Sequence, residues 1–245
     1  MINNRFYRKL ISTVILSIIL FIITLISKFD VSIVNKTVTT IILILSLVLV
    51  SVFLYFYNSN DKNSRKNKVL YTIIDYYATV VFAFVVIGIL NMFVIFPKVN
   101  GISMEPTLYN EDSVVVVRHS EINRFDIIVF YIDENLEGAP ESEIGNLWCK
   151  RVIGLPGDEV SYVNGDLFVN DIYYEEEYIN PNPLGSEETI LPSNIDGVKI
   201  PEGYYLVLGD NRTRSTDSRE IGFISKDLLI GEIKYLITGG IRKVG

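Results

Sequence analysis

Long apolar runs at the front of the chain constrain its fold more than any other feature of the sequence. Residues 10–27 form one uncharged run, and residues 38–57 form a second. A third run covers residues 69–96, with the membrane span itself placed at 72–96. A helix of about 20 apolar residues is long enough to cross the hydrocarbon core of a bilayer. The sequence therefore predicts an N-terminal membrane region with about three transmembrane α-helices.

The first run has an alternative interpretation as a cleavable signal peptide. Arg5, Arg8 and Lys9 precede it, as basic residues precede the apolar segment of such peptides. The run is longer than that segment usually is, and no small-x-small cleavage site follows it. We therefore expect a retained membrane anchor.

The distribution of positive charge predicts the orientation of these spans. Basic residues precede the first run, and four more lie between the second and third runs: Lys62, Arg65, Lys66 and Lys68. Cytoplasmic loops carry an excess of Lys and Arg. We therefore expect a multi-pass protein of the cell membrane with a cytoplasmic N-terminus and all residues after the third span outside. Asp75 would then lie at the cytoplasmic edge of that span, where it can reach the interface.

The remainder of the chain, residues 98–245, has a different charge. Residues 1–97 contain 9 Lys and Arg and 3 Asp and Glu, whereas residues 98–245 contain 13 and 26. An acidic region disfavours nucleic acid as a partner, because phosphate binding needs a basic face. The single cysteine, Cys149, excludes an internal disulfide and a cysteine-rich metal site. We expect no metal ion and no other cofactor.

Short alternating runs separated by turn residues predict a mainly β domain over residues 98–245. The candidate strands lie within residues 113–118, 126–132, 158–163, 166–170, 204–210 and 232–238. Asn164-Gly165 joins two of them and is typical of a tight β-hairpin. Residues 171–197 are acidic, rich in turn formers and without sustained periodicity. We expect them to form a surface excursion with no part in function.

A serine and a lysine are the candidate chemical groups. Ser103 stands in a turn, GISMEPTL, and a serine nucleophile needs a base to remove its proton. His119 is the single histidine, but it follows a strand and is expected to be a surface residue. Lys150 lies in a second segment, CKRVIGLPGD, where strand alternation places Lys150 and Arg151 on opposite faces.

A lysine can act as a base only where its surroundings favour the neutral amine. The pKa of a free lysine is about 10.4, so its use at pH 7 costs about 4.6 kcal/mol at about 1.36 kcal/mol per unit. Burial against apolar side chains can lower that pKa by several units. A strand lysine whose amine reaches solvent is the alternative, and the spacing leaves both interpretations open.

Three segments resemble, in order, the conserved boxes of type I signal peptidases, the membrane-bound serine proteases of the Ser-Lys dyad class. They are GISMEPTL, KRVIGLPGD and GDNRTRSTDSR, with DIIVF as the box between the first two. The resemblance covers most of residues 96–240 except 171–197. It implies N-terminal transmembrane helices followed by a mainly β extracytoplasmic catalytic domain of the signal peptidase type.

The resemblance also implies roles for individual residues. Ser103 corresponds to the nucleophile and Lys150 to the general base, while Ser215 would hydrogen-bond the amine of Lys150. Four charged residues of the third segment would position Ser215 through ion pairs and turn contacts: Asp210, Arg212, Asp217 and Arg219. Gly101 stands where some members have a serine that helps to stabilise the oxyanion. The backbone N–H of Ser103, assisted by the region of Gly101, would then carry more of that stabilisation.

The implied substrates are secretory preproteins whose signal peptides are cleaved after small residues, at an A-x-A-like site. Segments beside the dyad would line the substrate pockets, so the candidates are Val99, Met104, Trp148 and Cys149. Core packing is the alternative role for all four. Two other functions stay open at this point. One is a relative dedicated to a single membrane or pilin-like substrate, and the other is an inactive membrane-anchored scaffold.

Overall fold

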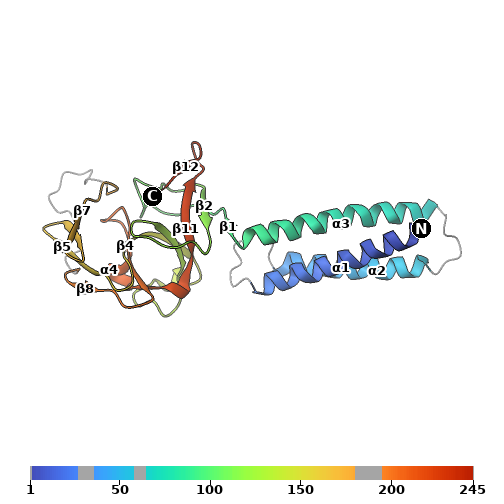
Figure 1. Ribbon diagram of the computed structural model, residues 1–245, viewed down its shortest axis with the longest axis horizontal. Coiled ribbons are helices and arrows are strands. Elements are labelled where there is room, and N and C mark those ends of the chain that lie inside the picture. The colour runs from blue at the N-terminus through green and yellow to red at the C-terminus, as the bar shows by residue number, and fades with distance from the viewer. Residues whose placement is uncertain (1, 27–35, 58–64, 180–194, 245) are drawn as a thin grey trace. The chain divides into compact units, whose positions relative to one another are not determined.

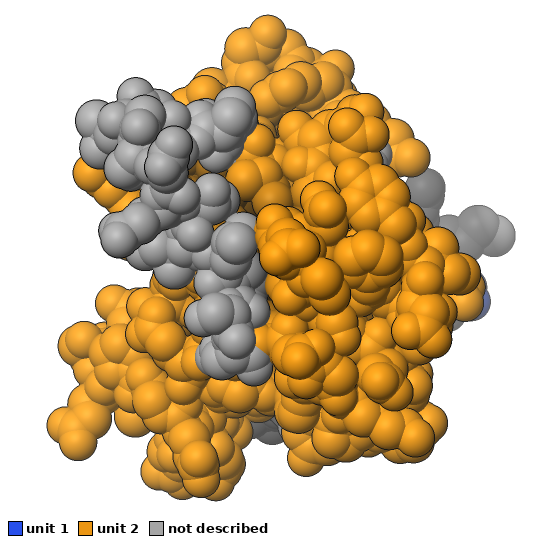
Figure 2. All heavy atoms as spheres, turned by 90° about the vertical axis from the view of Figure 1, so that its left-hand side faces the viewer, with its two compact units in different colours: residues 1–95 blue, residues 96–245 orange. Residues whose placement is uncertain are grey.

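A computed structural model describes residues 2–26, 36–57, 65–179 and 195–244 (Figure 1). The chain divides into two compact units, Met1–Ile95 and Phe96–Gly245. Figure 2 distinguishes the two units by colour, with the second in orange. The first unit is helical and the second is mainly β-structure.

Three long helices make up most of the first unit: α1 (Ile2–Ile26), α2 (Lys36–Tyr57) and α3 (Arg65–Asn91). They lie side by side in Figure 1, and α1 contacts both of the other helices. Their packed core includes Leu20, Ile42, Val81 and Val85. A short strand, β1 (Val94–Ile95), follows α3.

A network of hydroxyl groups joins the three helices inside this unit. Ser17 Oγ lies 2.7 Å from Ser46 Oγ, and Ser46 Oγ lies 2.9 Å from the hydroxyl of Tyr77. Tyr77 also donates a hydrogen bond to the carbonyl of Ile42 at 2.6 Å. Hydroxyl groups that bond across apolar helices satisfy each other and hold the helices together.

Within the described residues, Thr72–Asn91 is the one helical stretch long and apolar enough to cross a membrane. The apolar stretches of the other two helices, Leu10–Ile22 and Thr37–Val48, are shorter. The expected end of the third span, at Phe96, is wrong because α3 ends at Asn91 and β1 follows. Hydropathy could not place this end, because a short apolar run fits a helix and a strand equally well.

The second unit contains a large antiparallel sheet and a small one. The order in the large sheet is β2 (Val114–Val117), β11 (Leu229–Leu236), β3 (Ile127–Tyr131), β4 (Leu147–Gly154), β9 (Tyr204–Leu208) and β10 (Ile224–Ser225). A further strand, β12 (Arg242–Lys243), pairs with β11. The order in the small sheet is β7 (Ile172–Tyr174), β6 (Asp166–Val169), β5 (Glu159–Val163) and β8 (Val198–Lys199). Three short helical segments are α4 (Ser218–Ile221), η1 (Glu141–Glu143) and η2 (Lys226–Leu228).

Strands β4 and β9 lie between two hydrophobic clusters. Val152 and Val207 belong to one cluster, which also includes Ile221 of α4. Ile153 and Leu208 belong to the other, which includes the inward side chains of the small sheet. Successive side chains of a strand point to opposite faces, so this pair is packed on both sides. A strand packed on both faces holds its polar side chains in fixed positions.

The alternating pattern located the main strands: five of the six candidate segments contain an observed strand, and the sixth, 232–238, overlaps β11, which begins earlier at Leu229. The hairpin is also confirmed, because φ is 53° at Asn164 and 99° at Gly165 and β5 pairs with β6. The segment 171–197, expected to be a surface excursion, begins with a mostly exposed strand, because β7 pairs with β6. Residues 180–194 of that segment lie outside the described residues.

Candidate active site

Ser103 lies in a tight loop, residues 101–108, referred to below as the Ser103 loop. The loop is closed by backbone hydrogen bonds from Glu105 to Ile102 and from Leu108 to Met104. Asn211, which lies outside the loop, donates two hydrogen bonds to it. Its backbone N–H donates to the carbonyl of Ser103 at 3.0 Å, and its side chain donates to the carbonyl of Ile102 at 3.1 Å. The position of Ser103 is therefore set by a segment more than a hundred residues away in the sequence.

Lys150 lies in β4, where its side chain is 4% exposed. Its Nζ is 2.9 Å from the Oγ of Ser103 and donates to the carbonyl of Cys149 at 3.1 Å. The same nitrogen lies 5.1 Å from the centre of the Trp148 ring. The structure thus brings together the serine and the lysine that the sequence singled out, and it buries the amine.

Burial lowers the pKa of Lys150 below its ordinary value, because the charged amine loses its hydration. Cys149, Asp217 and Asp210 act in the opposite direction, but the net shift of this pKa is downward. A larger fraction of the amine is therefore neutral at a given pH than in a free lysine. A neutral amine within hydrogen-bond distance of a hydroxyl can accept its proton.

Asp210 connects β4 to the Ser103 loop. It accepts two hydrogen bonds from Arg151, at 2.8 and 2.6 Å, in a bidentate pair, and Thr107 of the Ser103 loop donates to the same carboxylate. Arg151 also donates to the carbonyl of Phe125 at 2.8 Å. As expected from strand alternation, Arg151 is ion-paired while its neighbour Lys150 reaches Ser103.

Asp217 and Arg219 shape the segment Gly209–Arg219, which we call the 209–219 loop. Asp217 pairs with Arg219 at 2.7 Å and accepts the backbone N–H of Gly209 at 2.9 Å. Arg219 in turn donates to the carbonyl of Ser215 at 3.2 Å. Both charged residues therefore fix the backbone on either side of Ser215.

Arg212 has a partner that the sequence analysis did not anticipate. It pairs with Glu176, and it also donates to the carbonyl of Gly209 at 3.2 Å. Glu176 belongs to the segment 171–197 that was expected to form a surface excursion, but its side chain makes a buried contact with the 209–219 loop. No local pattern in the sequence marks a pair of residues that lie 36 positions apart.

Gly209 sits where no side chain fits. A Cβ at this position would overlap Ser215 Oγ and would lie 2.6 Å from the carbonyl oxygen of Ser103. We expect Gly209→Ala to displace the Ser103 loop and to lower the rate of peptide cleavage about 100-fold, as a displacement of about 1 Å does in other enzymes. The measurement is kcat per molecule of folded enzyme. Gly239→Ala is a control for backbone strain without a clash, since φ is 74° there and nothing lies within 4 Å of a Cβ, and equal rates for both variants would contradict the prediction.

Ser215 does not make the hydrogen bond that was expected of it. Its Oγ is buried and has no hydrogen-bond partner among the residues that the structure describes. The expected bond from Ser215 to Lys150 is therefore not formed. The physical reason is local packing, because the Ser215 side chain lies against the bare Cα of Gly209.

The backbone around Ser103 contains both engaged amides and amides that donate to no group among the described residues. Gly101 has φ of 97°, and its N–H donates to the side chain of Asn110 at 2.9 Å. The N–H of Gly101 is already engaged by Asn110. It therefore does not supply the assistance in oxyanion stabilisation that was expected of the Gly101 region. The N–H of Ser103 donates to no group in the described part of the chain. It belongs to the residue whose hydroxyl faces Lys150, and it is available to a developing oxyanion.

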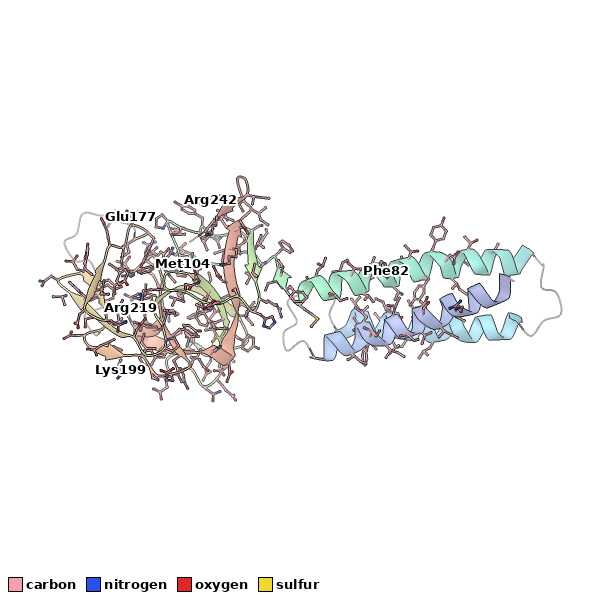
Figure 3. All side chains as sticks on the ribbon, viewed as in Figure 1. Phe82, Met104, Glu177, Lys199, Arg219 and Arg242 are labelled. Carbon is pink, nitrogen blue, oxygen red and sulfur yellow. The ribbon has the colours of Figure 1, made fainter. Side chains whose placement is uncertain are left out.

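A cavity of about 460 Å³ opens beside Ser103 and Lys150. Val99, Trp148 and Cys149 line it, in agreement with their selection from the sequence. Met104 does not line it, because that side chain is 1% exposed and packs in the interior of the second unit (Figure 3). Sequence reasoning did not select other lining residues, which include Glu143 of η1 and, from the quoted segment GDNRTRSTDSR, Arg214 and Thr216.

The expectation that His119 is a surface residue is confirmed. His119 is exposed and lies outside the lining of this cavity. Burial raises the pKa of the Cys149 thiol, which keeps it protonated. A protonated thiol is a poor nucleophile, so Cys149 contributes a wall of the cavity and not a reactive group.

Comparison with known proteins supports the resemblance. Residues 73–238 match the family described as signal peptidase, peptidase S26. Signal peptidase IB of Staphylococcus aureus (strain COL) is 32% identical over 178 residues, which cover 66% of this chain and 88% of that protein. Signal peptidase I P of Bacillus subtilis subsp. natto is 33% identical over 181 residues, which cover 70% of this chain and 90% of that protein.

A crystal structure of a signal peptidase I from Enterococcus faecalis V583 has 32% sequence identity with this chain. It covers 46% of this chain and 97% of its own, with a TM-score of 0.37. Helices α1 and α2 lie outside the residues that match the family. Because the family match covers more than half of the chain, the protein belongs to the signal peptidase family, peptidase S26, and is a serine endopeptidase.

Proposed function

We propose that this enzyme removes signal peptides from secreted precursor proteins, with Ser103 as nucleophile and Lys150 as general base. The observation that carries the proposal is the distance of 2.9 Å between Lys150 Nζ and Ser103 Oγ, with the amine buried. This contact also disfavours an inactive scaffold, because a buried lysine beside a serine hydroxyl has an energetic cost that a binding surface does not need.

The proposed reaction uses this geometry in four steps of bond and proton transfer. Ser103 Oγ attacks the scissile carbonyl while its proton passes to Lys150 Nζ, and the free N–H of Ser103 stabilises the oxyanion. The peptide C–N bond then breaks as Lys150 gives the proton to the leaving amine. Water attacks the resulting acyl-enzyme, Lys150 accepts a proton from that water, and Ser103 regains its own proton as it leaves.

The scaffold around the dyad supports this mechanism. Asp210, through Arg151, ties the base strand to the Ser103 loop, and Asn211 ties the 209–219 loop to Ser103 itself. Neither residue touches the reacting atoms. Their part is to keep Oγ and Nζ at a distance at which the proton can move. Ser215 retains the role of a supporting residue, through its packing against Gly209.

The proposed substrates are secretory preproteins with small residues at the −1 and −3 positions of the cleavage site. Val99, Trp148 and Cys149 line the cavity beside the dyad and are the proposed walls of the pockets for these residues. An extended segment can enter such a cavity as an added strand, and pocket size then selects against larger side chains.

We also propose that all three helices of the first unit cross the cell membrane, with the N-terminus inside. The basic residues before α1 and between α2 and α3 support this orientation. Three crossings would carry the second unit to the outer side of the membrane. A precursor whose apolar segment lies in the bilayer presents its cleavage site on that side.

One assay tests both specificity and orientation. A membrane-impermeant precursor peptide with Ala at −1 and −3 is added to intact cells and to detergent-solubilised enzyme, and the products are mapped by mass spectrometry. We expect cleavage after the −1 residue in both preparations. With Phe at −1 the rate should fall by about 100-fold. Equal rates for Ala and Phe would overturn the proposed specificity, and cleavage in detergent alone would overturn the orientation.

A further inference from the structure

Glu176 is a buried carboxylate that the mechanism above does not use. It follows β7, in the segment that was expected to be a surface excursion, yet its side chain is only 6% exposed. Arg212, Tyr162 and Tyr178 all donate hydrogen bonds to it. The distances to Oε1 are 2.5 Å from Arg212, 3.0 Å from Tyr162 and 2.7 Å from Tyr178, and Oε2 accepts further bonds from Arg212 and Tyr162 at 3.1 Å.

This arrangement satisfies the carboxylate fully. Charge-assisted hydrogen bonds in a buried setting are short and strongly directional, and losing one partner leaves an uncompensated charge. Burial raises the pKa of both Tyr162 and Tyr178, so the two hydroxyls remain protonated donors. Glu176 therefore holds the guanidinium of Arg212 in one position.

Arg212 transmits this constraint to the nucleophile. Its Nε donates to the carbonyl of Gly209, whose N–H is held by Asp217. Gly209 is the residue at which a Cβ would collide with Ser215 and the carbonyl of Ser103. Contacts therefore run without a gap from Glu176 through Arg212 and Gly209 to the backbone of Ser103.

The same segment also reaches the strand that carries the base. Tyr178, which donates to Glu176, has its ring 4.0 Å from the Cζ of Arg151. Arg151 is the neighbour of Lys150 in β4 and the partner of Asp210. An arginine over an aromatic face is attracted to it. Residues 176–178 thus contact the supports of both Ser103 and Lys150.

We infer that Glu176 is a positioning residue for catalysis, acting through Arg212 and Gly209 on Ser103. The inference rests on the proposed function, since it presupposes Ser103 as the nucleophile. Glu176 touches no reacting atom, so its loss should alter the alignment of the dyad and leave the substrate cavity intact. The lining of the cavity beside Ser103 and Lys150 does not include Glu176, Arg212 or Gly209.

The test uses the full-length enzyme in detergent and the precursor peptide described above. For Glu176→Gln we expect kcat per folded molecule to fall about 10- to 100-fold, with KM changed less than about twofold. Glu177→Gln is the matched control, because Glu177 is the exposed neighbour labelled in Figure 3, and wild-type kinetics are expected for it. An unchanged kcat in folded Glu176→Gln, or a change confined to KM, would overturn the inference.

A double-variant cycle separates positioning from a general loss of stability. If Glu176 acts through Arg212, adding Glu176→Gln to Arg212→Met should cause no further loss of kcat. Multiplicative losses would contradict the inference. Should the single variant fail to fold, Glu176→Leu with Arg212→Met removes both charges together and is better tolerated. The folded double variant should still show a reduced kcat, because the carbonyl of Gly209 has lost the hydrogen bond from Arg212. A wild-type kcat in this double variant would count against the inference.

The proposed function and this inference fail in different ways. If Ser103→Ala cleaves the peptide as fast as the wild type, the nucleophile assignment is wrong, whatever Glu176 does. If Ser103→Ala is inactive and Glu176→Gln is fully active, the proposed function stands and Glu176 has no positioning role.

Discussion

Replacing Ser103 by alanine is expected to abolish cleavage of a precursor peptide while the fold remains intact. The substitution removes the hydroxyl that lies 2.9 Å from Lys150 Nζ and leaves the backbone contact with Asn211 in place. In serine proteases the loss of the nucleophile alone lowers kcat by a factor on the order of 10⁶. The measurements are product formation by mass spectrometry and thermal unfolding of both proteins.

A matched substitution shows whether the effect belongs to this serine. Ser113 lies beside β2, and it is absent from the lining of the cavity. Ser113→Ala should therefore cleave the peptide at the wild-type rate. Residual cleavage by Ser103→Ala at more than about one hundredth of the wild-type rate would mean that another group attacks the carbonyl, because no other part of the site can replace the nucleophile to that extent.

Local patterns in the sequence were enough to locate the main strands, whereas Ser103 and Lys150 were assigned through the family resemblance. Alternation identified the strands, and Asn164-Gly165 identified a hairpin, because these signals come from residues that are adjacent in the chain. The apolar residues around Lys150 did not decide whether its amine is buried or reaches solvent. The structure shows that the amine is buried. Ser103 could be singled out because its turn and the segment around Lys150 resemble family segments.

Features that depend on distant residues could not be predicted. Glu176 occurs in a run of acidic residues typical of a solvated loop, and only the folded chain shows that Arg212 and two tyrosines surround it. Ser215 was given a hydrogen bond with Lys150, but it packs on Gly209, a contact set by the shape of the 209–219 loop. Met104 was chosen for its closeness to Ser103 in sequence, although its side chain points into the core.

Arg151 with Asp210 and Arg212 with Glu176 are two of the buried ion pairs that surround the site among the described residues. Desolvation cancels much of the attraction in such pairs, so their net contribution to stability is small. Their geometry is nevertheless restrictive, because a bidentate arginine accepts its partner in few orientations. Arg151 joins β4 to the Ser103 loop through Asp210 and Thr107, and Arg212 joins Glu176 to the 209–219 loop.

Replacing Lys150 by methionine is expected to leave the enzyme inactive at every pH, because the variant has no group to accept the proton of Ser103.

In the wild type, activity should rise with pH as the amine of Lys150 loses its proton. Burial lowers the pKa of Lys150, so this rise should occur below the ordinary lysine value of about 10.4. Lys199→Met is the control, since Lys199 is exposed (Figure 3), and it should keep the wild-type profile. A wild-type rate that is constant between about pH 5 and 9 would argue against a lysine base.

The same lowered pKa makes a prediction about stability. Between the folded pKa and the unfolded pKa of about 10.4, the unfolded chain holds a proton on Lys150 that the folded protein lacks. Unfolding is then favoured by falling pH, so the free energy of unfolding should increase as pH rises through this window. Lys150→Met removes this dependence and should be more stable than the wild type at neutral pH, measured by denaturant unfolding of both proteins. Equal stability at neutral pH, together with the same pH dependence in both, would show that the amine is not held neutral by the fold.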